Sequence, residues 1–118
     1  MATMNTVIEY VDRMKPNAYS DEDKYRWINT LEGMISREVL HEDAPEYSLP
    51  EDADMPLLVS SPYDEIYHLY VSAMIDFHNR EYEHYNNTAM AYTTMLEEFK
   101  KWYLRKNRPE SAGNFYNY

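Results

Sequence analysis

One pair of residues in the sequence has the types and the spacing of metal ligands, Glu81-x-x-His84. Helical bundles that hold two metal ions use an inward-facing Glu-x-x-His pair on each of two helices. This chain has a single copy, and if Tyr82 and Tyr85 point inward, His84 points toward solvent. The pattern therefore favours a helix built for packing, and we expect neither a metal site nor another cofactor.

Two carboxylate–imidazole pairs could in principle do acid–base chemistry. Asp64 and His68 are four residues apart, which places both side chains on one face of a helix, and Asp76 lies close to His78. Such pairs are more often ordinary surface pairs, and no nucleophile or glycine-rich phosphate loop accompanies them. The absence of cysteine also removes thiolate ligands and cysteine nucleophiles. We therefore expect a protein that is not an enzyme.

Length and charge narrow the class of protein further. A chain of 118 residues with 44% hydrophobic content is sufficient for one compact domain with one core. No apolar run is long enough to cross a bilayer, and the first residues lack a signal-peptide pattern, so we expect a cytosolic protein without a membrane partner. A net charge of -10 repels phosphate backbones and argues against wrapping of nucleic acid.

Hydrophobic periodicity predicts the first two helices of an all-α bundle. The first covers about residues 5–14, with Thr6 and Glu9 as a capping box. The second begins after Ser20, which can cap it, and ends near His41. Its predicted stripe contains Lys24 through its aliphatic stem, Trp27 or Ile28, Leu31, Met34 or Ile35, and Val39. The first helix places four residues on its apolar face: Val7, Ile8, Val11 and Met14.

One glycine interrupts the stripe of the second helix. Gly33 costs about 1 kcal/mol relative to alanine inside a helix. It is therefore expected to mark the close approach of another helix or a slight kink.

Two further helices are predicted to form an antiparallel hairpin. The third should begin with Ser61 as cap and Pro62 in the first turn, and a break over residues 78–80 should separate it from the fourth. Lysines and arginines near the end of the fourth helix match the negative end of its dipole. The predicted core face of the third helix is Ile66, Tyr70, Ala73 and Phe77. That of the fourth is Tyr82, Tyr85, Ala89, Tyr92, Leu96, Phe99 and Tyr103.

Residues 42–61 form a long, proline-rich and acidic connection between the second and third helices. Three prolines prevent a continuous helix, and no alternating partner for a strand is present, so we expect a loop packed on the domain. Residues 1–108 should thus form a single helical domain, and residues 109–118 a flexible aromatic tail.

Aromatic usage points to protein contacts. The chain has 13 tyrosines against 3 phenylalanines, and a tyrosine keeps a hydroxyl that needs water or a partner. Tyrosines outside the helical stripes are therefore candidates for an interface, together with an aromatic residue of the tail. These candidates are Tyr47, Tyr63, Tyr67, Phe115, Tyr116 and Tyr118.

Two long segments resemble one family of helical proteins. They are "VIEYVDRMKPNAYSDEDKYRWINTLEGMISREV" and "PYDEIYHLYVSAMIDFHNREYEHYNNTAMAYTTMLEEFKKWY", and together they cover most of the chain. In this order, Trp27, "LEG", "YDEIYHLYVSAMIDF", the Glu81-Tyr82 pair and "FKKWY" make the chain similar to the head-tail connector, adaptor or head-completion proteins of tailed bacteriophages and prophages. It departs from them at Asn79-Arg80, where a glycine is expected in the turn.

The resemblance implies a structural subunit without catalytic residues. Such a subunit forms a cyclic homo-oligomer on the portal protein, extends the DNA channel and docks the next neck or tail protein. It is located in the virion neck and assembles in the cytoplasm of the bacterial host. DNA would pass only as cargo, and an acidic wall would not hold it. Because of its charge density, the loop is expected to face the channel, with Glu51, Asp52 and Asp54 as the residues concerned.

Two other functions compete with this interpretation. A non-viral cytosolic adaptor or regulator could use the same aromatic residues as a monomer or a small closed oligomer. A bundle enzyme or metal-carboxylate protein would instead be purified with bound iron or manganese.

Overall fold

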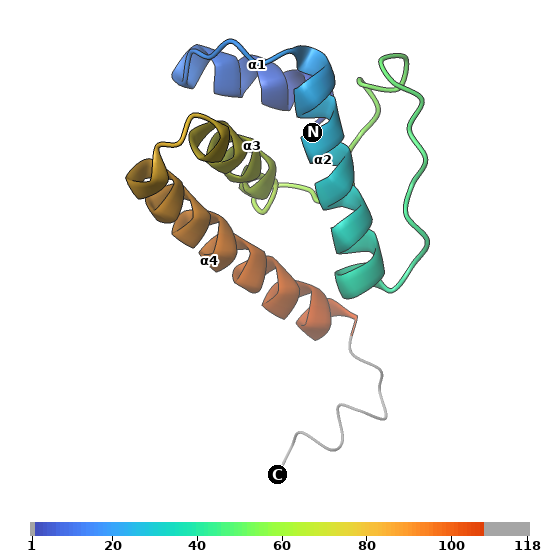
Figure 1. Cartoon of the computed structure of the whole chain (residues 1–118). Helices are drawn as coiled ribbons and strands as arrows, with labels where there is room; N and C mark the ends of the chain where they lie inside the picture. The colour runs from blue at the N-terminus through green and yellow to red at the C-terminus, as the bar shows by residue number, and fades with distance from the viewer. Residues whose placement is uncertain (1, 108–118) are drawn as a thin grey trace.

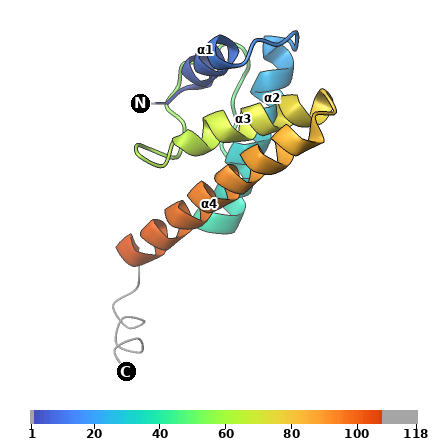
Figure 2. The same ribbon diagram turned by 90° about the vertical axis from the view of Figure 1, so that its left-hand side faces the viewer.

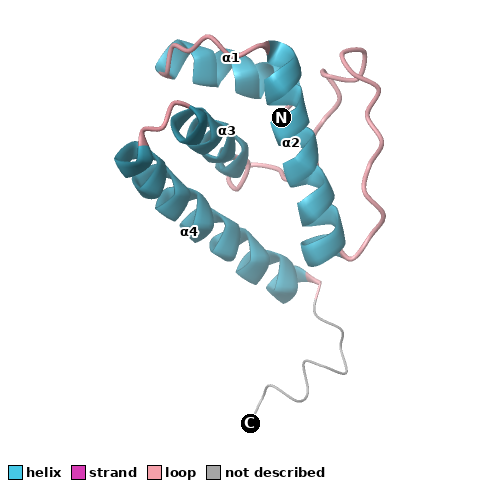
Figure 3. Cartoon of the chain, viewed as in Figure 1, coloured by secondary structure: helices cyan, strands magenta, loops and turns pink. Residues whose placement is uncertain are grey.

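The computed structural model describes residues 2–107, which form an all-α fold (Figure 1). Its four α-helices are α1 (Met4–Met14), α2 (Asp21–Ile35), α3 (Glu65–His78) and α4 (Tyr82–Lys106). A π-helical segment, Ser36–Leu40, directly continues α2, and residues 41–64 contain no helix or strand (Figure 3). The predicted all-α class is confirmed. Within this part of the chain, no helix is long and apolar enough to span a membrane.

Helix α3 lies at the centre of the molecule. It contacts α1, α2 and α4, and its contact with α4 is the most extensive between any two helices. Figures 1 and 2 show α4 along one side of α3, and the connection 41–64 along the outer side of α2. Part of the connection therefore lies away from α4, whereas its last residues return to this helix, where the Tyr63 ring lies 5.9 Å from the Phe99 ring.

The first helix begins earlier than its sequence suggests. Thr3, not Thr6, is the cap: the Thr6 amide donates to Thr3 Oγ1 at 3.1 Å, and the Thr3 amide donates to Thr6 Oγ1 at 2.9 Å. The prediction of a Thr6–Glu9 box was wrong because the cap lies three residues upstream, at Thr3, where the reciprocal threonine pair satisfies the free amides. The helix buries Met4, Val7, Ile8 and Val11, whereas Met14 is exposed at its end.

The second helix agrees with its predicted pattern. Ser20 caps it by accepting a hydrogen bond from the Asp23 amide at 3.2 Å. Every position predicted without an alternative is buried, and of the two alternative pairs Ile28 and Ile35 are the buried members. The predicted positions that are buried are Lys24, Ile28, Leu31, Ile35 and Val39, and Glu32, which lay outside the predicted stripe, is buried as well.

Gly33 lies beside the connection rather than beside another helix, and a side chain would fit there. A Cβ atom on Gly33 would lie 3.9 Å from the Cβ of Ala44, an ordinary van der Waals contact with the connection. The prediction that another helix approaches here is corrected, since residues 41–64 cover this side of α2.

Ion pairs reinforce the contacts between the helices. Lys24 is buried and donates to Asp12 Oδ1 at 2.7 Å, which joins α2 to α1. Buried Asp76 of α3 accepts hydrogen bonds from Lys15, directly after α1, and from Thr88 of α4. One carboxylate therefore connects three parts of the chain, which compensates the cost of burying its charge.

The third helix differs most from its prediction. It begins at Glu65 rather than directly after Ser61, because residues 61–64 form a turn. Ile66 and Ala73 are buried as predicted, but Phe77 is 46% exposed. Since other helices pack against α3 from several directions, its buried positions extend beyond a single stripe. They are Ile66, Tyr67, Val71, Ala73, Ile75 and Asp76.

The break between α3 and α4 lies where it is predicted. The Glu81 amide donates to the Asp76 carbonyl at 2.9 Å and the Arg80 amide to the Phe77 carbonyl at 3.0 Å. These two bonds form a Schellman motif. Arg80 has a φ of 63° and takes the left-handed position that glycine normally fills. The missing glycine therefore leaves the turn intact, with a non-glycine residue in an unfavourable backbone conformation.

The fourth helix is buried much less than its stripe predicts. Phe99 is its one buried residue, and Tyr82 at its beginning is exposed. Tyr92 is half-buried, with its ring 5.3 Å from the ring of Tyr70. Because α4 packs chiefly on a single helix, most of its surface remains uncovered.

Replacing Arg80 with glycine should stabilise the fold. A left-handed conformation costs about 1 kcal/mol or more for a residue with a Cβ atom, and glycine avoids this cost. We expect Arg80→Gly to exceed Arg80→Ala in free energy of unfolding by about 1 kcal/mol, because alanine retains the unfavourable conformation. Urea unfolding of both variants measures this difference, and equal stabilities would contradict the role given to the turn.

Candidate functional site

The two candidate metal ligands, Glu81 and His84, have no further metal-binding side chains beside them among residues 2–107. Glu81 and His84 are both exposed at the beginning of α4. Across residues 2–107, no group of three or more histidine, aspartate or glutamate side chains is arranged to hold a metal ion.

Asp64 and His68 line one cleft, together with Glu9, Tyr10 and Arg13. The cleft has a volume of about 350 Å³ and lies between α1 and the start of α3. The His68 ring lies 4.3 Å from the Tyr10 ring. The guanidinium of Arg13 lies over the Tyr10 ring, 5.6 Å from its centroid. Asp64 and His68 therefore share a cleft, but the carboxylate within ion-pair distance of His68 is that of Glu65, whose Oε2 atom lies 3.6 Å from Nδ1. Thr6 also lines the cleft, and its hydroxyl donates a hydrogen bond to the Thr3 carbonyl at 3.0 Å.

The carboxylate of Glu32 on α2 lies at the centre of a buried hydrogen-bond network. It is completely buried and accepts three hydrogen bonds. The Tyr67 hydroxyl donates to Oε1 at 2.5 Å, while the Leu58 amide at 2.9 Å and the Tyr47 hydroxyl at 3.0 Å donate to Oε2. The Val59 amide donates to the Tyr67 hydroxyl at 2.9 Å, which extends the network. Glu32 therefore holds the connection 41–64 against α2 and α3.

Burial dominates the electrostatics of this network. It raises the pKa of Glu32 above the ordinary value of 4.5, although the hydrogen bonds from Tyr67, Leu58 and Tyr47 oppose the rise. Burial, and then the charge of Glu32, raises the pKa of Tyr67 and of Tyr47 above 10.0. Both hydroxyls therefore remain protonated and able to donate at neutral pH.

Three of the predicted interface residues have contacts inside the molecule, and two of them belong to this network. Tyr67 has 0% exposure, so the prediction that it contacts a partner is corrected: its ring fills the core and its hydroxyl is required by Glu32. Tyr47 is half-buried and bound to the same carboxylate. Tyr63 is half-buried as well, with its ring 5.9 Å from Phe99 and 5.5 Å from Trp102. Contacts of Tyr47 and Tyr63 with a partner stay predictions.

The remaining predicted interface residues are Phe115, Tyr116 and Tyr118, which lie outside the described residues.

The three acidic residues predicted to face a channel have different surroundings. Asp52 accepts a hydrogen bond from the Ser48 amide at 2.8 Å, and Asp54 accepts one from the side chain of Asn5 at 2.8 Å. Both carboxylates therefore help to shape the connection. Glu51 is exposed. Of the three acids, neutralising Glu51 removes a charge with the least disturbance of the loop.

The outer face of α4, the side turned away from α3, is a candidate contact surface that was not predicted from the sequence. Met90 is 70% exposed and Leu104 67% exposed, and Asn86, Thr93 and Thr94 line a shallow groove with Met90. Its sequence signal is a run without Asp, Glu, Lys or Arg over residues 84–96, in a chain with 27% charged residues.

Comparison with protein-family models, with curated proteins and with solved structures found no match to this chain. Function therefore has to be inferred from the residues and their surroundings.

The buried carboxylate should give the protein a specific pH dependence. The folded state binds the proton of Glu32 more tightly than the unfolded chain does, so the contribution of Glu32 to stability falls as the pH rises above about 4.5. Glu32→Gln cannot titrate. We expect the free energy of unfolding of the wild type to fall relative to this variant with rising pH, by at most about 1.4 kcal/mol per pH unit.

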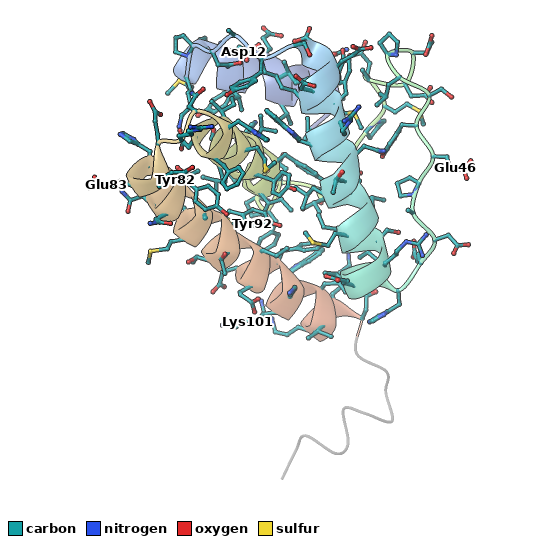
Figure 4. The ribbon with its side chains drawn as sticks, viewed as in Figure 1. Asp12, Glu46, Tyr82, Glu83, Tyr92 and Lys101 are labelled. Carbon is teal, nitrogen blue, oxygen red and sulfur yellow. The ribbon has the colours of Figure 1, made fainter. Side chains whose placement is uncertain are left out.

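Urea unfolding over a pH series that begins near pH 4 measures this dependence. Glu46→Gln is the matched control, because Glu46 is exposed on the outside of the same connection (Figure 4). If wild type and Glu32→Gln have parallel pH profiles, Glu32 does not titrate as described.

Proposed function

We propose that this chain is a structural subunit that acts through protein–protein contacts, of the head-tail connector type that its sequence resembles. The observation that carries the proposal is the outer face of α4, which is long, exposed and free of charged residues over 84–96. Solvent-exposed surfaces normally carry about a quarter to a third charged residues. Depletion of charge together with an exposed methionine is typical of the centre of an interface.

The opposite side of the molecule supports the connector reading. The connection contains the exposed acids Asp43, Glu46 and Glu51, and Figure 4 places Glu46 on the side of α2 away from α4. Exposed Glu42, in contrast, lines a pocket with the end of α4. A subunit of this kind can contact proteins through one side and present acidic groups on the other. An acidic wall repels the phosphates of DNA and so allows it to pass without being held.

Within this proposal the partners follow from the resemblance. The subunit joins copies of itself in a ring on the portal protein and docks the next neck or tail protein. DNA passes through as cargo, no cofactor is involved, and the assembled protein is part of the virion neck.

The proposal is tested by the molar mass of the protein in solution, alone and with a purified portal protein. Light scattering over a range of concentrations should show self-association, or a monomer that joins the portal in a fixed stoichiometry. A monomer or small oligomer that ignores the portal would contradict the connector function and favour the non-viral adaptor.

A pair of substitutions tests whether α4 is the contact surface. Met90→Glu places a charge at the centre of the uncharged face and should abolish self-association or portal binding, because an unpaired charge is costly to bury in an interface. Thr30→Glu adds the same charge at an exposed position of α2 and should leave assembly unchanged. Equal behaviour of the two variants would show that the contact lies elsewhere.

A further inference from the structure

We infer that the outer face of α4 binds the α4 helix of a second copy of the chain in an antiparallel orientation. This inference rests on the proposed function, in which the outer face of α4 is a protein contact.

The spacing of the outer residues fits a helix–helix contact. They follow one another at alternating steps of four and three, which is the repeat of a seam between two packed helices. All of them are exposed, so the seam is complete and uncovered along the helix. Its members are Glu83, Asn87, Met90, Thr94, Glu97, Lys101 and Leu104.

The charges of this seam select the orientation. Glu83 lies near the beginning of α4, and Glu97 and Lys101 lie near its end, while residues 84–96 carry no Asp, Glu, Lys or Arg. In an antiparallel pair centred on Tyr92, Glu97 faces the uncharged Asn87. In Figure 4, Glu83 and Lys101 lie on the open side of α4, whereas Tyr92 points toward the body of the molecule. Two parallel copies would place acid beside acid and base beside base.

An antiparallel pair removes this repulsion. With a two-fold axis at the level of Tyr92, Glu83 of each copy faces Lys101 of the other, and Met90 of each copy faces Thr94 of the other. Both ends of the contact then gain an ion pair, while the uncharged centres meet in the middle. Two molecules that each carry a net charge of -10 repel one another in most orientations. This orientation therefore lets them meet at the lowest electrostatic cost.

Lys101 is free to exchange its present partner. Its Nζ atom lies 3.9 Å from Glu98 Oε1, and the side chains of Lys101 and Glu98 are 64% and 56% exposed. Such an exposed pair contributes little to stability, so replacing it by a contact with Glu83 of a second copy costs little.

A two-fold contact is complete with two copies, whereas a ring needs a second, different surface. The dimer is therefore a property of α4, and the ring on the portal is a separate property of the proposed function. One can fail without the other.

Charge reversal in the full chain tests the inference. In sedimentation velocity over a concentration series, the wild type should form a dimer. Glu83→Lys and Lys101→Glu should each weaken self-association by at least about tenfold, because every ion pair becomes a like-charge pair. Mixing the two variants in equal amounts should restore the dimer, since each chain then supplies the charges that the other lacks. Glu46→Lys, the same change on the opposite side, should leave the dimer intact.

A wild type that stays monomeric, single variants that associate normally, or a mixture that does not recover would each overturn the antiparallel contact. Portal binding measured on the same variants separates the two proposals. Binding by chains that never dimerise would overturn this inference and leave the connector function in place. Dimers that ignore the portal would do the reverse.

Discussion

The arrangement of this molecule depends on the buried carboxylate of Glu32. A charge without water is stable only when its oxygens are occupied, and here Tyr67, Tyr47 and the Leu58 amide occupy them. The last two donors belong to the connection 41–64, which has no regular structure of its own. Hydrogen bonds have direction, so they restrict the path of this segment more narrowly than apolar contacts alone. Buried Ala53, Leu57 and Val59 then complete the packing.

The position of the connection explains why α4 is left open. Residues 41–64 pack along α2, and α1 packs against α3 and α2, so the apolar surfaces of the first three helices are covered by one another and by this segment. Helix α4 is added on the remaining side of α3, with Phe99 as its single buried residue. The outer face of α4 is thus exposed because the other helices and the connection already close the core.

Much of this could be predicted from local patterns, and the failures have physical reasons. The stripe of α2 and the break after His78 follow from periodicity and spacing, which act within a few residues. The buried face of α3 could not be predicted this way, because a helix packed from several sides has no single stripe. Tyr67 was misread because its partner, Glu32, lies 35 residues away in the sequence. The uncharged run 84–96 indicates an exposed contact face on α4. That only one helix packs against α4 could not be predicted, because it depends on the tertiary arrangement.

The same hydrogen bonds determine where the chain length can vary. The bonds that Glu32 accepts close segments of 15, 26 and 35 residues, to Tyr47, Leu58 and Tyr67. The entropy lost on closing such a segment grows only with the logarithm of its length, so each doubling costs about 0.6 kcal/mol. Residues inserted near exposed Glu46 would therefore add little to the free energy of folding, provided that the three donors reach the carboxylate. In chain-entropy terms, the connection is fixed at a few points and free in length between them.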